Sequence, residues 1–295
     1  MDNNLFDFRS AIQSAGLEPP NHIVPGTLHR FPGNNKKSGN RAGWCLYFED
    51  GLGGCFGDWS SGISETWHAK YHKPYSSTER ATYARRMKEI KKLRNAQLKL
   101  RQVNAAKRAA KIWKAATSAP SNHPYLILKH IHPHGARIYK GMITLPVMDF
   151  INKITSLQFI SKDGNKLLLS GGRKGGCFIP VSGNITSHSR VILCEGWATG
   201  CTLAEDDPTA MVMAAIDAGN LEPVALAVRH RWPSTEIVIA GDDDRLTAGN
   251  PGATKAKAAA RASGALLALP EWPEDAPEHL TDFNDLIIWL AGDEV

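Results

Sequence analysis

Residues 190–200 are RVILCEGWATG, and residues 236–244 are EIVIAGDDD. In each stretch an apolar run is followed at once by acidic residues, Glu195 in the first and Asp242 with Asp244 in the second. Apolar, β-branched runs of this length between helical patterns predict buried strands of a parallel sheet. Because sites in open parallel sheets form at the carboxyl ends of the strands, we expect an acidic site there.

Glu195, Asp242 and Asp244 are the candidate catalytic and metal-binding residues. If their strands are neighbours, the three carboxylates converge, and like charges packed together cost energy unless a cation neutralises them. Mg²⁺ or Mn²⁺ suits such oxygen ligands and would also accept phosphate oxygens of a nucleotide. We expect Asp243 to point away or to cap the next turn. Either motif alone would also be typical of a surface turn, and only the pair indicates a site.

Strand and helix patterns alternate through residues 188–275, which we interpret as the catalytic α/β domain. The tail, residues 276–295, contains TDFNDLIIWL (281–290), a predicted helix with Asp282 as its N-cap. The expected strands are 190–195, 210–215, 236–242 and 265–270, and the expected helices are 198–206, 221–232 and 252–263.

Residues 118–187 have strand character, and their glycine-rich run GGRKGG (171–176) is basic. This run is not a Walker A loop, because no Gly-Lys-Ser/Thr follows it. It could present backbone N–H groups, Arg173 and Lys174 to phosphates, and a mobile hairpin turn is the alternative. The expected strands are 143–150, 153–160, 166–171 and 176–181.

Residues 76–117 are predicted to form one long helix with a strongly basic surface. They contain 13 Lys and Arg residues but only two acidic residues, a net charge of +11, whereas the whole chain carries +6. One interpretation is a solvated linker helix that packs through an apolar stripe, which includes Leu100 and Val103. The other is a helix whose basic residues bind the phosphate backbone of a nucleic acid, and the two roles are compatible. The candidate phosphate contacts on it are Arg85, Arg86, Lys91 and Lys92.

Residues 1–75 predict a small β-rich domain with many aromatic residues. GWCLYF (43–48) and GGCFGDW (53–59) indicate two strands around a turn. We favour a small aromatic core over a base-stacking platform for these side chains. Zinc is not expected here, because the possible ligands lack metal-binding spacing. These are His29, Cys45, Cys55 and His68.

The composition is that of an ordinary globular protein, with 295 residues, 42% hydrophobic and 22% charged. This length predicts two domains or more. We expect no membrane partner, because no apolar run reaches the length of a membrane span. The start, MDNNLFDFRS, has no secretory-signal pattern, and the five cysteines are scattered. We therefore expect reduced thiols and a cytoplasmic protein.

The acidic motifs resemble those of the Toprim domain, the catalytic fold shared by bacterial-type primases, topoisomerases and some nucleases. Glu195 matches the family's glutamate after the first strand, and Asp242 with Asp244 matches its Asp-x-Asp after the third. Other segments resemble the Toprim primases of plasmids and phages. They are DAGNL (217–221), the helix start at 252–257, DFND (282–285), HPYL (123–126), SLQFISKDG (156–164), GGRKGGCF (171–178) and the HRFP…GWC…GDW pattern (29–59).

The resemblance implies a Toprim-like parallel sheet flanked by helices and the activity of a DNA primase. Such an enzyme joins ribonucleoside triphosphates into short RNA primers on single-stranded DNA, for phage, plasmid or mobile-element replication. Glu195 would act as general base or metal ligand, and Asp242 and Asp244 would hold the Mg²⁺ or Mn²⁺ ions. The accessory candidates are Asp282, Asp285 and Lys255.

The chain also departs from that family. It lacks the cysteine-rich zinc ribbon with which these primases often begin, and it has no Walker A motif, which implies a separate helicase. A Toprim nuclease would use the same acids, and a non-catalytic single-strand-binding or replication-loading factor would keep them for folding. A topoisomerase is disfavoured, because no region can be assigned to the strand-cleaving tyrosine and gate.

Overall fold

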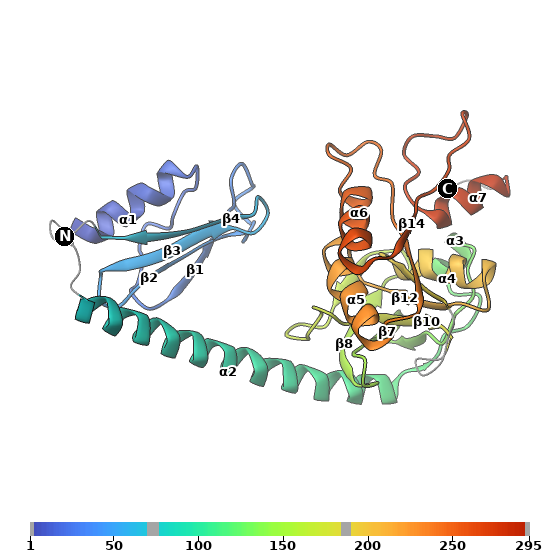
Figure 1. Ribbon diagram of the computed structural model, residues 1–295, viewed down its shortest axis with the longest axis horizontal. Helices are drawn as coiled ribbons and strands as arrows, with labels where there is room; N and C mark the ends of the chain where they lie inside the picture. Colours follow the sequence, from blue (N-terminus) through green and yellow to red (C-terminus); the bar gives the residue numbers. More distant parts are fainter. Residues whose placement is uncertain (1–2, 70–76, 184–189, 293–295) are drawn as a thin grey trace. The chain divides into compact units, whose positions relative to one another are not determined.

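A computed structural model describes residues 3–69, 77–183 and 190–292 (Figure 1). The chain divides into two compact units, Met1–Met87 and Lys88–Val295. Both contain helices and sheets, so the expected α/β class is confirmed. None of the helices within the described ranges combines the length and the apolar character of a membrane span.

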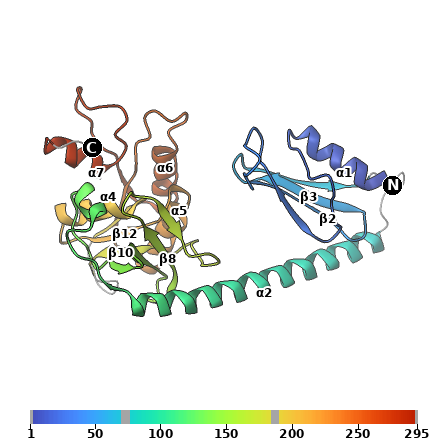
Figure 2. The ribbon, with the colours of Figure 1, turned by 180° about the vertical axis from the view of Figure 1, so that it is seen from behind.

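The N-terminal unit is a four-stranded antiparallel sheet of order β1-β2-β3-β4, with helix α1 against one face (Figure 2). Phe8 of α1 contacts the rings of Tyr47, Phe56 and Trp67, which confirms the aromatic core for these three residues, whereas Trp59 lies outside it and is 58% exposed. The expected hairpin is confirmed as β2 and β3, whereas α1, β1 and β4 were not predicted. The elements are α1 Asn3–Ser14, β1 Leu28–Phe31, β2 Gly43–Tyr47, β3 Gly53–Asp58 and β4 Ile63–His68.

Helix α2, Ser77–Ala115, confirms the predicted long helix. The predicted apolar stripe was wrong in its middle, because Leu100 is 62% and Val103 39% exposed. Among the helix residues whose side chains are described, the buried positions are instead Ala105 and Ala109. A Cβ added at Gly171 would lie 3.8 Å from the Ala105 Cβ, so small residues on both sides allow the helix backbone to approach this loop.

An antiparallel sheet of order β5-β6-β7-β8-β9 precedes the parallel one. Its strands β7, β8 and β9 correspond to the expected strands at 143–150, 153–160 and 166–171. The fourth expected strand, β10 (Ile179–Ser182), pairs instead with the parallel sheet as its antiparallel edge. The elements are β5 Thr117–Ser118, α3 Pro124–Leu128, β6 Arg137–Tyr139, β7 Met142–Met148, β8 Ile154–Ile160 and β9 Lys166–Leu168.

The third sheet has the order β10-β12-β11-β13-β14, and β12, β11, β13 and β14 run parallel. The strands and helices expected between residues 190 and 290 are all present, with shifts of a few residues at their ends. The elements are β11 Arg190–Cys194, α4 Trp197–Asp206, β12 Met211–Ala214, α5 Ala218–Arg231, β13 Glu236–Ala240, α6 Pro251–Ser263, β14 Leu266–Ala268 and α7 Phe283–Leu290.

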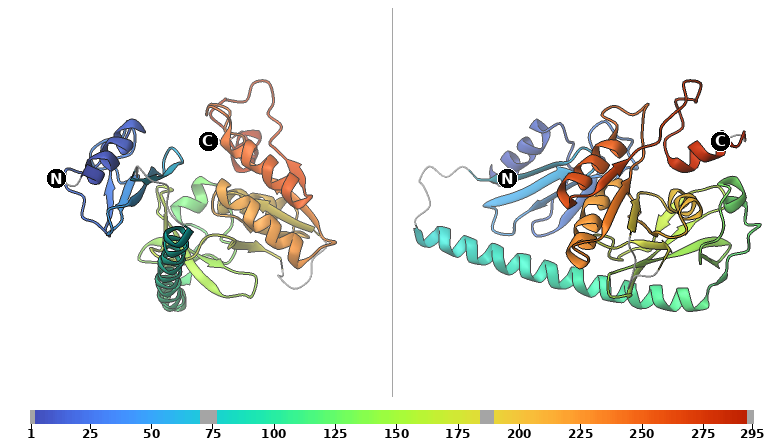
Figure 3. Two further views of the ribbon diagram at one scale, coloured as in Figure 1. Left: turned by 60° about the vertical axis from the view of Figure 1, so that its left-hand side comes forward. Right: turned by 45° about the vertical axis from the view of Figure 1, so that its right-hand side comes forward.

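The parallel sheet is buried on both faces (Figure 3). Successive side chains of a strand point to opposite faces. In β11, Val191 and Leu193 therefore join the core beneath α5 and α6, while Ile192 and Cys194 join the core shared with α4 and β7. This two-sided burial fixes the register of the strands, and with it the position of the residues that follow them.

Candidate active site of the C-terminal unit

Glu195 and Asp242 leave neighbouring strands at the same edge of the sheet. Strands β11 and β13 pair in parallel, with Cys194 opposite Ala240. Glu195 follows Cys194 directly, and Asp242 comes two residues after Ala240. The condition for convergence, that these strands are neighbours, is therefore met.

The electrostatics of the acidic edge show that its carboxylates interact. Burial raises the pKa of Asp242 to about 8, with further raising by the charges of Asp282, Glu195 and Asp244. Burial likewise raises the pKa of Glu195, although a hydrogen bond from the backbone of Ala218 opposes this shift. Both groups are thus held in surroundings that disfavour their negative charge.

Asp242 offers an oxygen that suits a metal ion. Its Oδ1 atom is buried and has no hydrogen-bond partner within the described residues. A buried acceptor without a partner is costly, and a divalent cation among crowded carboxylates would satisfy the oxygen and the charge together. Residues 3–69, 77–183 and 190–292 contain no preformed group of three His, Cys, Asp or Glu side chains around a metal position. The fit to a Mg²⁺-type ion rests instead on the chemistry of the donors, because carboxylate oxygens are the ligands that this ion prefers.

The carboxylates of Asp244 and Asp243 have different hydrogen-bond partners. Asp244 Oδ2 accepts a hydrogen bond from the Gly252 N–H at 2.8 Å, at the start of α6. Asp243 accepts from Trp272 Nε1 at 2.9 Å and from Asn250 Nδ2 at 2.5 Å. The expectation that Asp243 points away is confirmed, because its carboxylate is used to hold the loop between β13 and α6.

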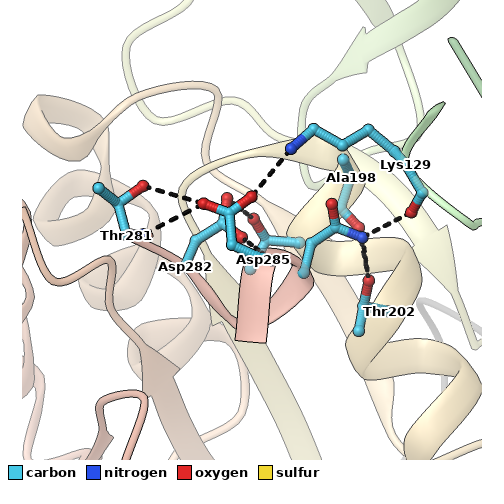
Figure 4. Close-up of polar contacts among 8 residues, drawn as sticks. Lys129, Ala198, Thr202, Thr281, Asp282 and Asp285 are labelled. Carbon is cyan, nitrogen blue, oxygen red and sulfur yellow. Dashed lines mark hydrogen bonds and ion pairs between the residues drawn. The ribbon is translucent and has the colours of Figure 1, made fainter. Parts of the chain in front are cut away.

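Asp282 joins the acidic edge while capping α7 (Figure 4). Its Oδ1 accepts from the Asp285 N–H at 2.9 Å, as predicted for an N-cap, and its Oδ2 accepts from Thr199 Oγ1 at 3.1 Å. Burial, followed by the Asp285 charge, raises the pKa of Asp282. Asp282 also contributes to the raised pKa of Asp242. The two roles that the sequence left open for Asp282 are therefore compatible.

The other side chains of the DFND motif tie α7 to a distant segment (Figure 4). Lys129 Nζ forms an ion pair with Asp285 Oδ1 at 3.0 Å. Asn284 Nδ2 donates to the Lys129 carbonyl at 2.7 Å and to Thr202 Oγ1 at 2.9 Å. The Asp285 carboxylate is thus already paired, while its backbone N–H supports Asp282. The sequence analysis did not identify Lys129 as a site residue. The only feature of the sequence that could have indicated it is its position three residues after the HPYL motif.

The motifs and this geometry agree with the comparison against protein families, in which residues 190–290 match the Toprim domain. Residues 190–290 form a Toprim domain. The resemblance inferred from the sequence is therefore confirmed for this part of the chain.

Two relatives from Escherichia coli, both named DNA primase TraC, are 32% identical to this chain. The alignments cover 98% and 90% of this chain, so they extend beyond the Toprim domain into the N-terminal unit. The chain spans only 22% and 26% of the length of these relatives. Among solved structures, the DnaG primase catalytic domain is 12% identical to this chain, with a TM-score of 0.44. The alignment covers 67% of this chain and 77% of the DnaG chain.

Lys166, which the sequence analysis did not single out, brings a positive charge to the Toprim acids. It starts β9 of the preceding sheet, and it lowers the pKa of both Glu195 and Asp242. Its Nζ would lie 3.7 Å from a Cβ added at Gly196. Lys255, the predicted accessory cation, is instead exposed on α6. The pairing of β8 with β9 places Lys166 here, which no local pattern indicates.

The GGRKGG loop is attached to the Toprim domain by Asn220. The Asn220 Nδ2 donates to the Cys177 carbonyl at 2.8 Å, and its Oδ1 accepts from the Gly176 N–H at 2.9 Å. In the loop, Arg173 pairs with Asp149 at 2.8 Å, and Lys174 pairs with Asp217. Both cations are therefore partly neutralised by the protein itself.

The remaining candidates belong to helix α2 and to the sheet of the N-terminal unit. Arg85, Lys91 and Lys92 are exposed on α2, and Arg86 lies on the same helix with its side chain outside the described part. Cys45 and Cys55 occupy adjacent strands, but Cys45 pairs with Phe56 and Cys55 with Leu46. Since successive side chains alternate, the two thiols point to opposite faces of the sheet.

Proposed function

We propose that this chain is the catalytic part of a DNA primase that joins ribonucleotides on a single-stranded DNA template. The observation that carries the proposal is the convergence of Glu195 and Asp242 at one edge of the Toprim sheet, with the buried oxygen of Asp242 unpaired. The similarity to the TraC primases over 98% of the chain supports the choice of primase among Toprim activities.

Each acid has a distinct role in this proposal. The raised pKa of Glu195 suits a general base that accepts the proton of the 3′-hydroxyl as this group attacks the α-phosphate of the incoming nucleotide and pyrophosphate leaves. Asp242 and Asp244 would hold the metal, and the Gly252 N–H orients Asp244. A bound Mg²⁺ or Mn²⁺ would supply charge neutralisation at the triphosphate. Lys166 adds a positive charge on the same side, where it can meet the triphosphate of the incoming nucleotide.

The two rival functions are less well supported. A Toprim nuclease would share the acids, but it would not account for the similarity of the upstream segments to primases. A non-catalytic loading factor would gain nothing from acids whose crowding opposes their ionisation. We also propose a separate replicative helicase as partner and a cytoplasmic location.

The test is a synthesis assay with the purified chain, single-stranded DNA, labelled ribonucleotides and Mg²⁺ or Mn²⁺. The proposal expects short labelled oligonucleotides that appear only when template, metal and all reactants are present. Degradation of the template without synthesis would contradict the primase proposal and would favour a Toprim nuclease. Binding of the template with neither product would contradict catalysis by this chain.

A further inference from the structure

A small pocket of the Toprim domain lies between helices α4 and α7. Its volume is about 260 Å³, below the roughly 300–1,000 Å³ that is usual for pockets of drug-sized ligands. The space therefore suits a single side chain rather than a nucleotide. Its apolar wall consists of Ile287, Ile288 and the C-cap Ala291 of α7, and the wall from α4 contains Thr202, Glu205 and Asp206.

Asn284, which also lines this pocket, has a buried oxygen without a partner. The residue is 1% exposed, and its Nδ2 donates to the Lys129 carbonyl at 2.7 Å and to Thr202 Oγ1 at 2.9 Å (Figure 4). Because the Thr202 hydroxyl itself donates to the Ala198 carbonyl, it can only accept from Asn284, and this fixes the orientation of the amide. Asn284 Oδ1 then has no hydrogen-bond partner within the described residues. Such a buried acceptor is costly, so the pocket favours an occupant that carries a donor.

The charged side chains of the pocket are acidic. Glu205 accepts from the His132 N–H at 2.9 Å and contacts the rings of His132 and His134 at 3.3 and 2.7 Å, and all three contacts involve its Oε1 atom. The Glu205 Oε2 atom takes part in none of them, and Asp206 is exposed. Of the described residues that line the pocket, none is a lysine or an arginine. The pocket thus offers acceptors and negative charge to a cation.

We propose that this pocket binds an arginine side chain of a protein partner. The apolar stem of the arginine would lie on Ile287 and Ile288. Its planar guanidinium carries five N–H donors, so it can meet Asn284 Oδ1 and a carboxylate of Glu205 or Asp206 at the same time. The site makes no use of the Toprim acids, and it does not depend on the primase proposal.

The surface around the pocket favours a protein over a free cation. Ile127 and Leu128 of α3 are 59% and 56% exposed, and Leu290 of α7 is 57% exposed. The bond from Asn284 to the Lys129 carbonyl joins these two helices at the pocket. Exposed apolar residues beside a polar pocket are typical of a surface that binds another protein. A partner segment with an arginine between apolar residues matches this surface.

The test titrates the whole chain, with ¹³C-labelled isoleucine methyl groups, and follows the signals of Ile287 and Ile288 by NMR. It is done at pH 8, because His130 also lines the pocket and a protonated imidazole would repel the cation. The first pair of probes is N-acetyl-arginine amide and N-acetyl-citrulline amide, which has a similar shape but no charge. The arginine probe should bind roughly tenfold more tightly, since charge-assisted hydrogen bonds are about twice as strong as neutral ones. Equal affinities for the two probes would overturn the proposal.

The second comparison distinguishes a protein partner from a free cation. The acetylated tripeptide amide Leu-Arg-Leu should bind more tightly than N-acetyl-arginine amide, because its leucines cover exposed apolar residues. Equal affinities for these two probes would assign the pocket to a small cation and would contradict a protein partner.

Variants of the pocket give an independent readout with the tripeptide. Ala291→Phe, at an exposed position, should fill the pocket and weaken binding by roughly tenfold or more, whereas Ala291→Ser should bind as the parent does. Asp206→Asn should weaken binding about two- to fivefold, the contribution of an exposed ion pair, and Glu222→Gln on α5 is its matched control. Parental affinity in Ala291→Phe would overturn the proposal. Self-association of the parent in sedimentation, lost in Ala291→Phe, would instead identify a second copy of this chain as the occupant and contradict a separate partner.

Discussion

Lys129 and Asp285 are 156 positions apart in the sequence, and their side chains form an ion pair of 3.0 Å. The pair joins the end of α3 to the first turn of α7. Asp285 also donates its N–H to Asp282, whose charge acts on Asp242. We infer that Lys129 is a positioning residue for the acidic edge of the Toprim sheet.

Lys129→Met should raise the concentration of Mg²⁺ needed for half-maximal synthesis. Without the lysine, the negative charge of Asp285 is no longer neutralised, and it acts on the neighbouring carboxylate of Asp282. The partly buried pair predicts a loss of about 1–2 kcal/mol in the free energy of unfolding. Metal titration of the synthesis rate measures the effect. Lys129→Arg should restore it, and Lys162→Met, at an exposed lysine, should not alter it. An unchanged metal requirement in Lys129→Met would refute the positioning role.

Gly252→Ala should slow primer synthesis by displacing the loop that carries Asp242 and Asp244. An added Cβ would lie 2.7 Å from the Asp242 carbonyl and 3.0 Å from Asp244 Oδ2, so the loop that carries both acids must move. A misplacement of about 1 Å can cost up to about 100-fold in rate. Steady-state kinetics of primer synthesis should show the loss in kcat. Arg261→Ala, an exposed change on the same helix, is the control, and equal rates for the two variants would count against this loop geometry.

Asp242→Asn should abolish stabilisation by Mg²⁺ without lowering the stability of the metal-free protein. Because the folded protein raises the pKa of Asp242 from 3.8 to about 8, the charged group reduces the stability of the metal-free protein as pH rises through that window. Without metal, at pH near 8, the variant should therefore be at least as stable as the parent. Mg²⁺ at about 100 times Kd should raise the unfolding temperature of the parent by about 5–10 °C and leave the variant nearly unchanged. Equal Mg²⁺ shifts would show that Asp242 is not a ligand.

Asp58→Asn should remove a pH dependence of the N-terminal unit. Burial alone would raise the pKa of Asp58, but hydrogen bonds from Ser60, Asn34 and Ser61 outweigh it and lower the pKa from 3.8 to about 2. A lowered carboxyl pKa gives stability that is present above pH 3.8 and is lost as pH falls toward 2. Near-ultraviolet circular dichroism of this unit's tryptophans should follow that loss in the parent. The variant should be less stable at neutral pH, and an identical acid transition would contradict the role of Asp58.

The sequence was sufficient for the Toprim sheet because its information is local. The two strands that precede the acids, β11 and β13, are apolar runs with several β-branched residues, and each acid follows its strand within two residues, so parallel pairing alone brings Glu195 and Asp242 together. The Asp282 cap was predictable for the same reason, since it precedes an apolar helix.

Other features depend on contacts between distant segments. Lys166 reaches the acids through the pairing of β9 with β8, and Lys129 through its pair with Asp285. The helix α2 was predicted, but its buried side was not, because the buried residues Ala105 and Ala109 give little hydrophobic signal. The pairing of Arg173 with Asp149 was equally hidden, since neither residue indicates its partner.

The central claim is that Glu195 carries primer synthesis, and formation of the first phosphodiester bond tests it most directly. The assay compares the parent, Glu195→Gln and Glu222→Gln, an exposed glutamate of the same Toprim domain, on single-stranded DNA with two ribonucleotides and Mg²⁺. We predict that Glu195→Gln loses at least about 100-fold in rate while its unfolding temperature and DNA affinity stay parental, and that Glu222→Gln keeps the full rate. A dinucleotide formed by Glu195→Gln at the parental rate would contradict the account.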